Sequence, residues 1–262
     1  MNAITIAHLS DIHYAPSEIS AVSTMLREKG VFVEKLLPKC LDNLKIRKPD
    51  IILITGDLTH ESPAEDFRYL KNQLKAALPD TPVLCTIGNH DIRSAFRQGF
   101  LDETPSDAPY YDSMIVNGYQ FVSLDSAYVN GLTGYFTDEA LDYLEEKLKN
   151  TEVDGTILMM HHPFLAHARH LKMNMNDRLE KILRSGKIKA IFNGHVHGSY
   201  TSSVFGIPQF TADSLKTCFD IHPDCIAYNS RAGYEIVSFD ENGDWMTERF
   251  LLNPEVETYF KK

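Results

Sequence analysis

Short apolar runs recur along the first three quarters of the chain, and each is followed at once by polar residues. Five of these runs hold four to six residues rich in Ile, Leu or Val, a pattern that suits strands buried on both faces. They are residues 4–9, 51–55, 83–87, 157–160 and 190–193. Because segments of helical period lie between them, the order predicts an α/β fold. If the strands lie side by side, their carboxyl ends gather five loops in one crevice.

The first segment of helical period carries one continuous apolar stripe from Val33 to Leu44. Pro38 lies inside this stripe. Because proline removes a backbone donor and crowds the preceding turn, the helix either begins near Pro38 or bends there. The sequence leaves both alternatives open.

Three further helices are indicated by residues that favour helix ends. Ser62 is predicted as the N-cap of one helix, with Glu65 completing a capping box. Thr137 is predicted to cap the next helix. The last helix is expected to run from Asn176 to Gly186, because glycine favours helix termination.

The later part of the chain changes to short β-type stretches separated by Gly, Pro and Asn. These are residues 200–205, 207–211, 234–239 and 245–250. Asn117-Gly118 adds a hairpin over residues 115–124, because this pair tolerates the positive φ angles of a type I′ turn. These strands are too many for a single sheet. We therefore predict a four-layer α-β-β-α sandwich of two mixed β-sheets flanked by helices.

The length of the chain suits one hydrophobic core, and no internal repeat or linker interrupts it. We expect a single domain over residues 1–262. Within it, residues 198–252 form a β-rich C-terminal part and residues 253–262 a loosely held tail.

Residues of metal-ligand type follow all five of the buried-strand candidates. The segments are Asp11-Ile12-His13, Gly56-Asp57, Gly88-Asn89-His90-Asp91, His161-His162 and Gly194-His195-Val196-His197. Carboxylate oxygens and imidazole nitrogens without thiolates suit Mn, Fe, Co or Zn and disfavour a purely structural zinc site. Any one segment could arise by chance, but their joint order predicts a two-metal hydrolytic site. Asp57 is the candidate for the carboxylate that bridges the two metals.

The charge balance excludes some classes of function. The chain has 26 Lys and Arg against 36 Asp and Glu, a formal net charge of −10, whereas nucleic-acid binding needs a basic face. No signal-like segment begins the sequence, and no run approaches the roughly 20 apolar residues of a membrane helix. We expect a soluble cytoplasmic protein without membrane contact.

The cysteines Cys40, Cys85, Cys218 and Cys225 lack both the spacing of a zinc knuckle and the density of a disulfide scaffold. They are predicted to be buried reduced thiols. A bridge between Cys218 and Cys225, across a turn through Pro223, is the alternative.

Taken together, the five metal-ligand segments resemble the calcineurin-like metallophosphoesterase superfamily over residues 4–197. The resemblance implies an α/β sandwich with two divalent metal ions. It assigns the first metal to Asp11, His13, Asp57 and His197, and the second to Asp57, Asn89, His161 and His195. It further implies that a metal-bridging hydroxide attacks phosphorus, that His90 contacts the phosphate and aids the leaving oxygen, and that Asp91 orients the His90 imidazole.

Within that superfamily, Ser10-Asp11-Ile12-His13 and His161-His162-Pro163 are similar to segments of the class III cyclic-nucleotide phosphodiesterases. This similarity implies hydrolysis of small phosphodiesters, with 3′,5′-cyclic nucleotides favoured and glycerophosphodiesters or phosphomonoesters as alternatives. A homodimer is also implied. His60 departs from the pattern, because members commonly carry an acidic residue there.

Two other classes of function stay open on the sequence alone. A DNA-directed nuclease of the same superfamily usually carries an added DNA-binding region, and this acidic chain shows no basic stripe. A non-catalytic scaffold arises on this fold when ligand positions are replaced, whereas every ligand position here holds a competent residue.

Several residues near these segments allow two interpretations. His8 lies inside a strand candidate and is expected to pack within the core, while His162 either supports the site or only packs. A basic cluster, formed by His167, Arg169 and His170, is either a cationic rim for the substrate or an ordinary exposed face. Three aromatic residues either stack on a substrate base or pack against the sheet edge; they are Tyr14, Tyr128 and Phe164.

Overall fold

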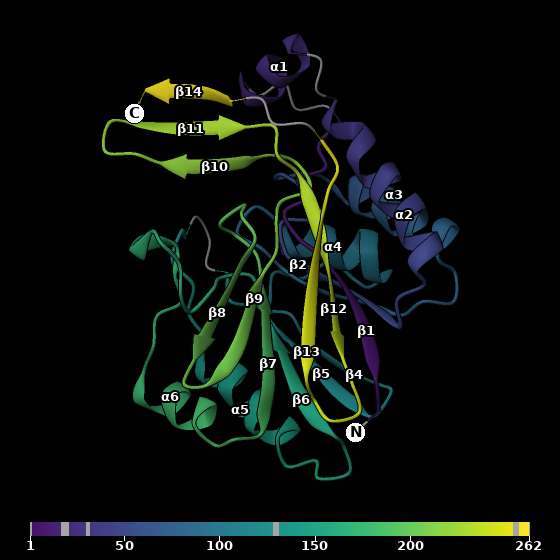
Figure 1. The fold of residues 1–262 in the computed structure, drawn as a ribbon, viewed down its shortest axis with the longest axis vertical. Coiled ribbons are helices and arrows are strands. Elements are labelled where there is room, and N and C mark those ends of the chain that lie inside the picture. The colour runs from purple at the N-terminus through teal and green to yellow at the C-terminus, as the bar shows by residue number, and fades with distance from the viewer. Residues whose placement is uncertain (1, 17–20, 30–31, 128–130, 254–256, 262) are drawn as a thin grey trace.

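The structure is a computed structural model that describes residues 2–16, 21–29, 32–127, 131–253 and 257–261 (Figure 1). Two large sheets form its centre. The first has the strand order β13-β12-β1-β2-β3, and the second has the order β4-β5-β6-β7-β9-β8. β1, β2 and β3 run parallel to one another, as do β5, β6, β7 and β9, while β12, β13, β4 and β8 run antiparallel to their neighbours. Both sheets are therefore mixed, as predicted.

The bounds of these strands agree closely with the apolar runs. The first sheet contains β1 (Ile4–Leu9), β2 (Ile51–Thr55), β3 (Val83–Thr86), β12 (Gly233–Phe239) and β13 (Trp245–Leu251). The second contains β4 (Tyr111–Val116), β5 (Tyr119–Leu124), β6 (Gly155–Met159), β7 (Ile188–Asn193), β8 (Tyr200–Val204) and β9 (Ile207–Thr211).

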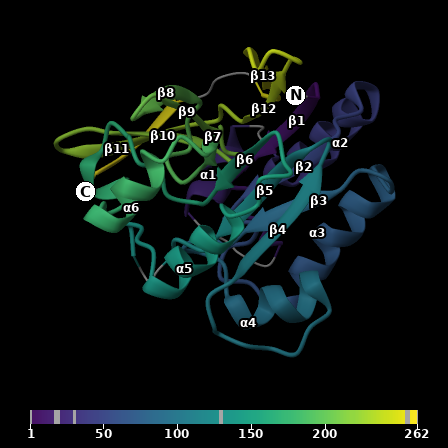
Figure 2. The ribbon, with the colours of Figure 1, turned by 90° about the horizontal axis from the view of Figure 1, so that it is seen from below.

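Helices cover the outer faces of the two sheets. α2 (Leu36–Arg47) and α3 (Ala64–Ala77) lie on one side, and α5 (Asp138–Lys147) and α6 (Asp177–Leu183) lie on the other (Figure 2). The shorter helical segments are α1 (Ala21–Glu28), η1 (Val33–Lys35), α4 (Arg93–Phe96), the π-helical η2 (Arg97–Leu101) and η3 (Arg169–Leu171).

Three apolar clusters fill the spaces between these layers, and strand β2 shows why. Ile52 and Ile54 pack with α2 and α3, whereas Ile51 and Leu53 face the second sheet. This alternation follows from the two-residue period of a strand. A third cluster joins the far side of the second sheet to α5 and α6. The three clusters confirm the four-layer α-β-β-α sandwich.

The helix ends confirm some expectations and correct one. Pro38 is the third residue of α2, so the helix begins just before it, in the first turn where proline costs little. The Thr137 hydroxyl accepts from the Ala140 amide and caps α5, and Asn176 caps α6 in the same way through Leu179. The Ser62 cap was wrong, because α3 begins after Pro63 without a side-chain cap.

A small third sheet stands apart from the two large ones, at the top of Figure 1. It has the order β10-β11-β14, built from β10 (Cys218–Ile221), β11 (Cys225–Asn229) and β14 (Glu257–Lys261). The sequence analysis did not predict β10 and β11. It also assigned residues 253–262 to a loose tail, whereas residues 257–261 pair antiparallel with β11.

Two further expectations concern the cysteines and membrane-spanning helices. All four cysteines are free, so Cys218 and Cys225 are not bridged. Among the described residues, no helix has both the length and the apolar character needed to cross a membrane.

Candidate metal centre

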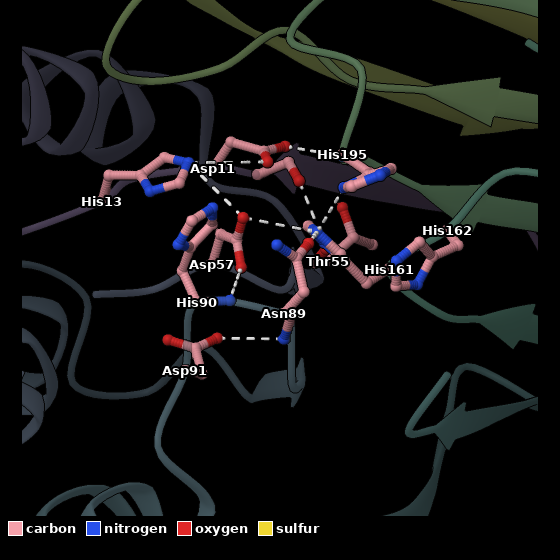
Figure 3. Close-up of polar contacts among 12 residues, drawn as sticks. Asp11, His13, Thr55, Asp57, Asn89, His90, Asp91, His161, His162 and His195 are labelled. Atoms are coloured by element: carbon pink, nitrogen blue, oxygen red, sulfur yellow. Dashed lines mark hydrogen bonds and ion pairs between the residues drawn. The ribbon is translucent and has the colours of Figure 1, made fainter. Parts of the chain in front are cut away.

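Loops that follow β1, β2, β3, β6 and β7 meet at one point between the two large sheets. They bring together all seven side chains that the sequence analysis named as metal ligands: Asp11, His13, Asp57, Asn89, His161, His195 and His197. Figure 3 labels the first six of these residues. The strands do not belong to a single sheet, because β1 to β3 lie in the first and β6 and β7 in the second. Backbone hydrogen bonds join the loops, for instance from the Asp11 amide to the Gly56 carbonyl at 3.0 Å.

One half of this cluster is formed by Asp11, His13 and His197, whose ligand atoms all lie within 4.8 Å of one another. The Nε2 atoms of His13 and His197 are 3.1 Å apart. His197 Nε2 lies 3.3 Å from Asp11 Oδ1, and His13 Nε2 lies 3.4 Å from Asp57 Oδ2.

The other half surrounds His161. Its Nε2 atom lies 3.1 Å from Asn89 Oδ1 and 3.1 Å from His195 Nδ1. Asp57 Oδ2 is 3.4 Å from the same nitrogen. The carboxylate of Asp57 therefore stands between His161 and His13 and belongs to both halves of the cluster.

Backbone carbonyls fix which nitrogen of each ring faces inward. His161 Nδ1 lies 2.7 Å from the Thr55 carbonyl, His197 Nδ1 lies 2.7 Å from the Thr217 carbonyl, and His195 Nε2 lies 2.9 Å from the Leu132 carbonyl. A carbonyl only accepts, so each of these nitrogens carries a proton, and in the neutral ring the opposite nitrogen presents a lone pair to the cluster. This is the arrangement that orients metal-ligating histidines.

The inward atoms fit divalent cations better than they fit one another. Asp11 Oδ1 is buried and has no hydrogen-bond partner, which is costly for a carboxylate oxygen unless a cation or donor meets it. When both rings are neutral, His161 Nε2 and His195 Nδ1, 3.1 Å apart, direct lone pairs at each other, and a cation beside them removes this repulsion. The oxygen and nitrogen donors suit first-row divalent ions.

Charge inside the cluster acts on Asp57 and His161 together. Burial favours the neutral forms of both groups, but their mutual attraction outweighs it. The pKa of Asp57 is held well below its ordinary range by His161 and His13. Asp57 is therefore a carboxylate at neutral pH, the form in which it could hold a metal.

The backbone at the ligands adopts conformations that side-chain-bearing residues rarely take. Five of the seven ligand candidates have left-handed φ angles, namely Asp11 at 51°, His13 at 44°, Asp57 at 51°, His195 at 70° and His197 at 47°. Each such residue costs on the order of 1–3 kcal/mol, and strain of this kind gathers at functional sites.

Two glycines allow the loops to approach this closely. A Cβ atom on Gly88 would collide with the Asp57 carboxylate, and one on Gly194 would collide with Ser10 and Asp11. Any larger residue at either position would push a ligand loop away from its partner.

Asp91 does not hold the His90 imidazole as the sequence analysis expected. Its carboxylate oxygens instead accept from the backbone amides of Gly88, Leu58 and Thr59 at 2.9–3.1 Å. Burial, reinforced by Asp57, raises the pKa of Asp91 to about 7. Asp91 therefore joins the loops that follow β2 and β3 and positions Asp57 through the backbone.

His90 lies at the edge of the cluster and is partly exposed. Its backbone amide donates to Asp57 Oδ1 at 2.9 Å, and its ring stacks on His60 with centroids 4.3 Å apart. His60 in turn places Nδ1 3.0 Å from Nδ1 of His13. The residue that departs from the superfamily pattern thus contacts a ligand candidate directly.

A cavity of about 380 Å³ opens over the cluster. Its floor includes His13, Asp57, Asn89, His90, His195 and His197, and its walls add His60, Leu132, His170, Leu171, Lys216, Thr217, Phe219, Ile221, Ile226 and Tyr228. The sequence analysis missed Lys216 and the four residues of β10 and β11. The alternation of apolar residues in 218–221 and 225–229 is the signal that could have indicated the four strand residues, whereas Lys216 has no such signal.

Of the residues that allowed two interpretations, one supports the site and three pack elsewhere. His8 is buried with Nε2 3.0 Å from the Thr55 hydroxyl, as expected for a core residue. His162 packs on His195 with ring centroids 4.3 Å apart and so supports the site from behind. Phe164 is buried in the core. Tyr14 stacks on Tyr69 away from the cavity over the cluster.

Of the basic cluster, His170 lines the cavity. His167 lines an adjoining hollow that shares His170 with it, and Arg169 is among the lining residues of neither. The two histidines therefore lie beside these hollows, and a rim that binds substrate stays a prediction. Tyr128 lies outside the described residues.

Comparison with known proteins points the same way as the geometry. Residues 4–199 match the calcineurin-like phosphoesterase family. A probable cyclic nucleotide phosphodiesterase of Rhodococcus erythropolis is 34% identical over 226 residues, which cover 82% of this chain and 71% of that protein. A cAMP/cGMP dual specificity phosphodiesterase of Mycobacterium tuberculosis is 32% identical over 178 residues, which cover 66% of this chain and 55% of that protein.

More distant proteins resemble this chain in sequence or in fold. A probable glycerophosphodiester phosphodiesterase of Arcobacter nitrofigilis is 25% identical over 228 residues, covering 80% of this chain and 82% of that protein. The solved structure of a dimetal phosphatase from Danio rerio superposes with a TM-score of 0.60 at 13% identity, covering 93% of this chain and 98% of the other. The match to the family over residues 4–199 settles the classification: this chain belongs to the calcineurin-like phosphoesterase family.

Proposed function

We propose that this protein is a dinuclear metal-dependent phosphodiesterase that hydrolyses small phosphodiesters, with 3′,5′-cyclic nucleotides as its substrate class. The observation that carries the proposal is the position of Asp57. Its Oδ2 atom lies 3.4 Å from the inward nitrogen of His13 and 3.4 Å from that of His161. A single carboxylate thus joins two groups of donors, which is what two neighbouring cations require.

Asp11, His13, Asp57 and His197 would hold one divalent ion, and Asp57, Asn89, His161 and His195 the other. When bound, the two ions would neutralise phosphate charge and lower the pKa of water from its bulk value of about 15.7 toward neutrality. The residues of the chain fix the ligand atoms in advance, since carbonyls set three of the ring tautomers. That preorganisation is the main contribution a protein makes to phosphoryl transfer.

His90 and Lys216 are the groups of the chain that would meet the substrate beside the ions. His90 lines the cavity and keeps one face of its ring against His60, which leaves it placed to donate a proton to the oxygen that leaves phosphorus. Lys216 lines the same cavity and acts electrostatically on His13. Its charge would attract an anionic substrate to the floor.

The substrate class rests on relatives and on charge. The relatives from Rhodococcus and Mycobacterium are named as phosphodiesterases of cyclic nucleotides, and the net charge of −10 disfavours long nucleic acids. Glycerophosphodiesters are the second candidate, because the Arcobacter relative is named for them. A non-catalytic scaffold would not need the seven donors converging on one point.

Substitution of Asp57 by Asn tests the proposal. The amide keeps the shape but removes the charge shared by the two donor groups, so we expect kcat/KM to fall at least about 100-fold with loss of bound metal. Manganese-loaded protein is assayed on bis-p-nitrophenyl phosphate and 3′,5′-cAMP, and metal is counted by mass spectrometry. Asp80→Asn makes the same change at an exposed turn and should alter neither measurement.

Retention of near wild-type, metal-dependent turnover by Asp57→Asn would contradict the bridging role. A wild-type protein that neither binds metal nor turns over either diester would favour the scaffold. Turnover of glycerophosphoethanolamine well above that of cAMP would move the substrate class to the second candidate.

A further inference from the structure

The cavity over the metal centre has two chemically different sides. Its floor is made of the charged and polar ligand candidates. The opposite wall is made of four apolar side chains from β10 and β11, namely Phe219, Ile221, Ile226 and Tyr228. A substrate that fits both sides must be anionic at one end and apolar at the other.

The strand register explains why these four side chains act together. Phe219 pairs with Tyr228 across the hairpin, and Ile221 pairs with Ile226. Residues two apart on a strand and directly opposite on its partner share one face of the sheet. The four residues therefore form a continuous apolar face, and all four are half-buried rather than covered.

Two aromatic rings lie at the end of this face nearest the metal centre. The ring of Phe219 lies 4.9 Å from that of His197 and 6.0 Å from that of Tyr228, measured between centroids. His197 is itself a ligand candidate, so an aromatic surface begins directly beside the position where the phosphate would sit. Flat rings bind flat rings by stacking and by exclusion of water.

Resting on the proposed function, we infer that the β10–β11 hairpin is the specificity element of the site and that Phe219 and Tyr228 bind the aromatic base of a nucleotide diester. The phosphate lies on the polar floor and the base on the apolar face. Small polar alcohol groups, such as glycerol or ethanolamine, gain nothing from this face. A volume of about 380 Å³ lies in the range of roughly 300–1,000 Å³ that accommodates molecules of this size.

Phe219→Ala is the main test. Stacking of a base on an aromatic side chain contributes about 1–3 kcal/mol by alanine substitution, so kcat/KM for 3′,5′-cAMP should fall roughly 5- to 150-fold. For glycerophosphoethanolamine, which has no ring, kcat/KM should change less than about twofold. The inhibition constant of inorganic phosphate should also stay constant, because phosphate touches only the floor.

Phe219→Tyr keeps the ring and should retain cAMP turnover. Cys225→Ala changes the opposite face of the same hairpin, the face away from Phe219 and Tyr228, and serves as the matched control. Because Phe219 also contacts His197, bound metal is counted in every variant. Tyr228→Ala is the second test. If Phe219→Ala loses metal, the Tyr228 variant decides whether the hairpin binds the base.

The outcomes separate this inference from the proposed function. Selective loss of cAMP turnover with metal retained, in either alanine variant, supports base recognition by the hairpin. Equal losses on cAMP and glycerophosphoethanolamine, or no loss on either, overturn it while leaving a working phosphodiesterase. Absence of diesterase activity in the wild type would overturn the proposed function itself.

Discussion

At the scale of single residues, the metal centre overrides the ordinary preferences of the chain. His195 and His197 both take left-handed φ angles, at 70° and 47°, although such angles are uncommon for residues other than glycine. Between them, Val196 keeps the two rings apart, so that each reaches a different half of the cluster. The contacts that the ring nitrogens of His195 and His197 make offset the strain of these backbone angles.

His60 gives a prediction at this scale, because it is the partner of His13 on the side away from the cluster. Removing the ring in His60→Ala leaves His13 without the contact that orients it. We expect metal affinity and kcat/KM to fall about 10- to 100-fold, the usual cost of losing such a partner. Metal titration followed by steady-state kinetics would measure both.

His60→Asp is the matched variant, since an acidic residue restores a partner for His13 Nδ1. It should recover most of the lost metal affinity. An alanine variant that binds metal as tightly as the wild type would show that the contact between His60 and His13 has no functional role.

At the scale of elements, most strands could be predicted because burial on both faces leaves an uninterrupted apolar run. β1 and β2 begin and end where the runs do. β10 and β11 were missed because they are short, and Asp220 and Asn229 leave no long uninterrupted apolar run. β14 was missed because only its three central residues favour a strand, and its two end residues, Glu257 and Lys261, are charged.

The metal-ligand candidates could be predicted because each follows a buried strand directly. The apolar run predicts the strand, and the strand's end predicts where the ligands lie. Lys216, by contrast, follows an irregular stretch with no periodic signal. It reaches the cavity because the Ser214 hydroxyl accepts from its amide and donates to the Asp11 carbonyl. The role of Asp91 was misjudged because a sequence cannot show that backbone amides will satisfy a carboxylate.

The pairing of β1 with β12 gives a prediction about pH. His8 and Glu235 are register partners, both buried, with His8 Nδ1 3.9 Å from Glu235 Oε2. Burial raises the pKa of Glu235 to about 8 and lowers the pKa of His8 to about 3. Asp213 favours the protonated acid and Arg249 and Ser199 oppose it. Both partners are therefore neutral at pH 7, and the contact is not an ion pair.

The two groups act on stability with opposite signs. Between their ordinary pKa values, near 4.5 and 6.5, the unfolded chain keeps a proton on His8 and loses one from Glu235, so the effects cancel. From pH 6.5 to 8 only Glu235 differs, since the folded state holds a proton that the unfolded state has lost. Glu235 by itself should then lower the free energy of unfolding by up to about 1.4 kcal/mol per pH unit.

Glu235→Gln mimics the protonated acid and should flatten this decrease. Urea unfolding of both proteins at pH 6.5, 7.25 and 8 would measure the difference in slope. Parallel slopes in the two proteins would mean that Glu235 is ionised in the folded state.

At the scale of the whole molecule, the metal centre lies where the two large sheets meet. Asp11, Asp57 and Asn89 come from loops of the first sheet, and His161, His195 and His197 from loops of the second. Cations held there would connect the two halves of the sandwich in addition to their chemical role. The homodimer that the superfamily resemblance implies stays a prediction.

This placement predicts that metal stabilises the entire fold. A ligand that binds only the folded state adds about 2.7 kcal/mol at a concentration 100 times its Kd, and for a chain of this size that corresponds to a rise in Tm of roughly 5–10 °C. Thermal unfolding of protein stripped with EDTA and then supplied with Mn²⁺ would show the rise. Asp57→Asn should abolish most of it, because both halves of the cluster lose their common carboxylate. An equal rise in that variant would place the stabilising ion elsewhere on the molecule.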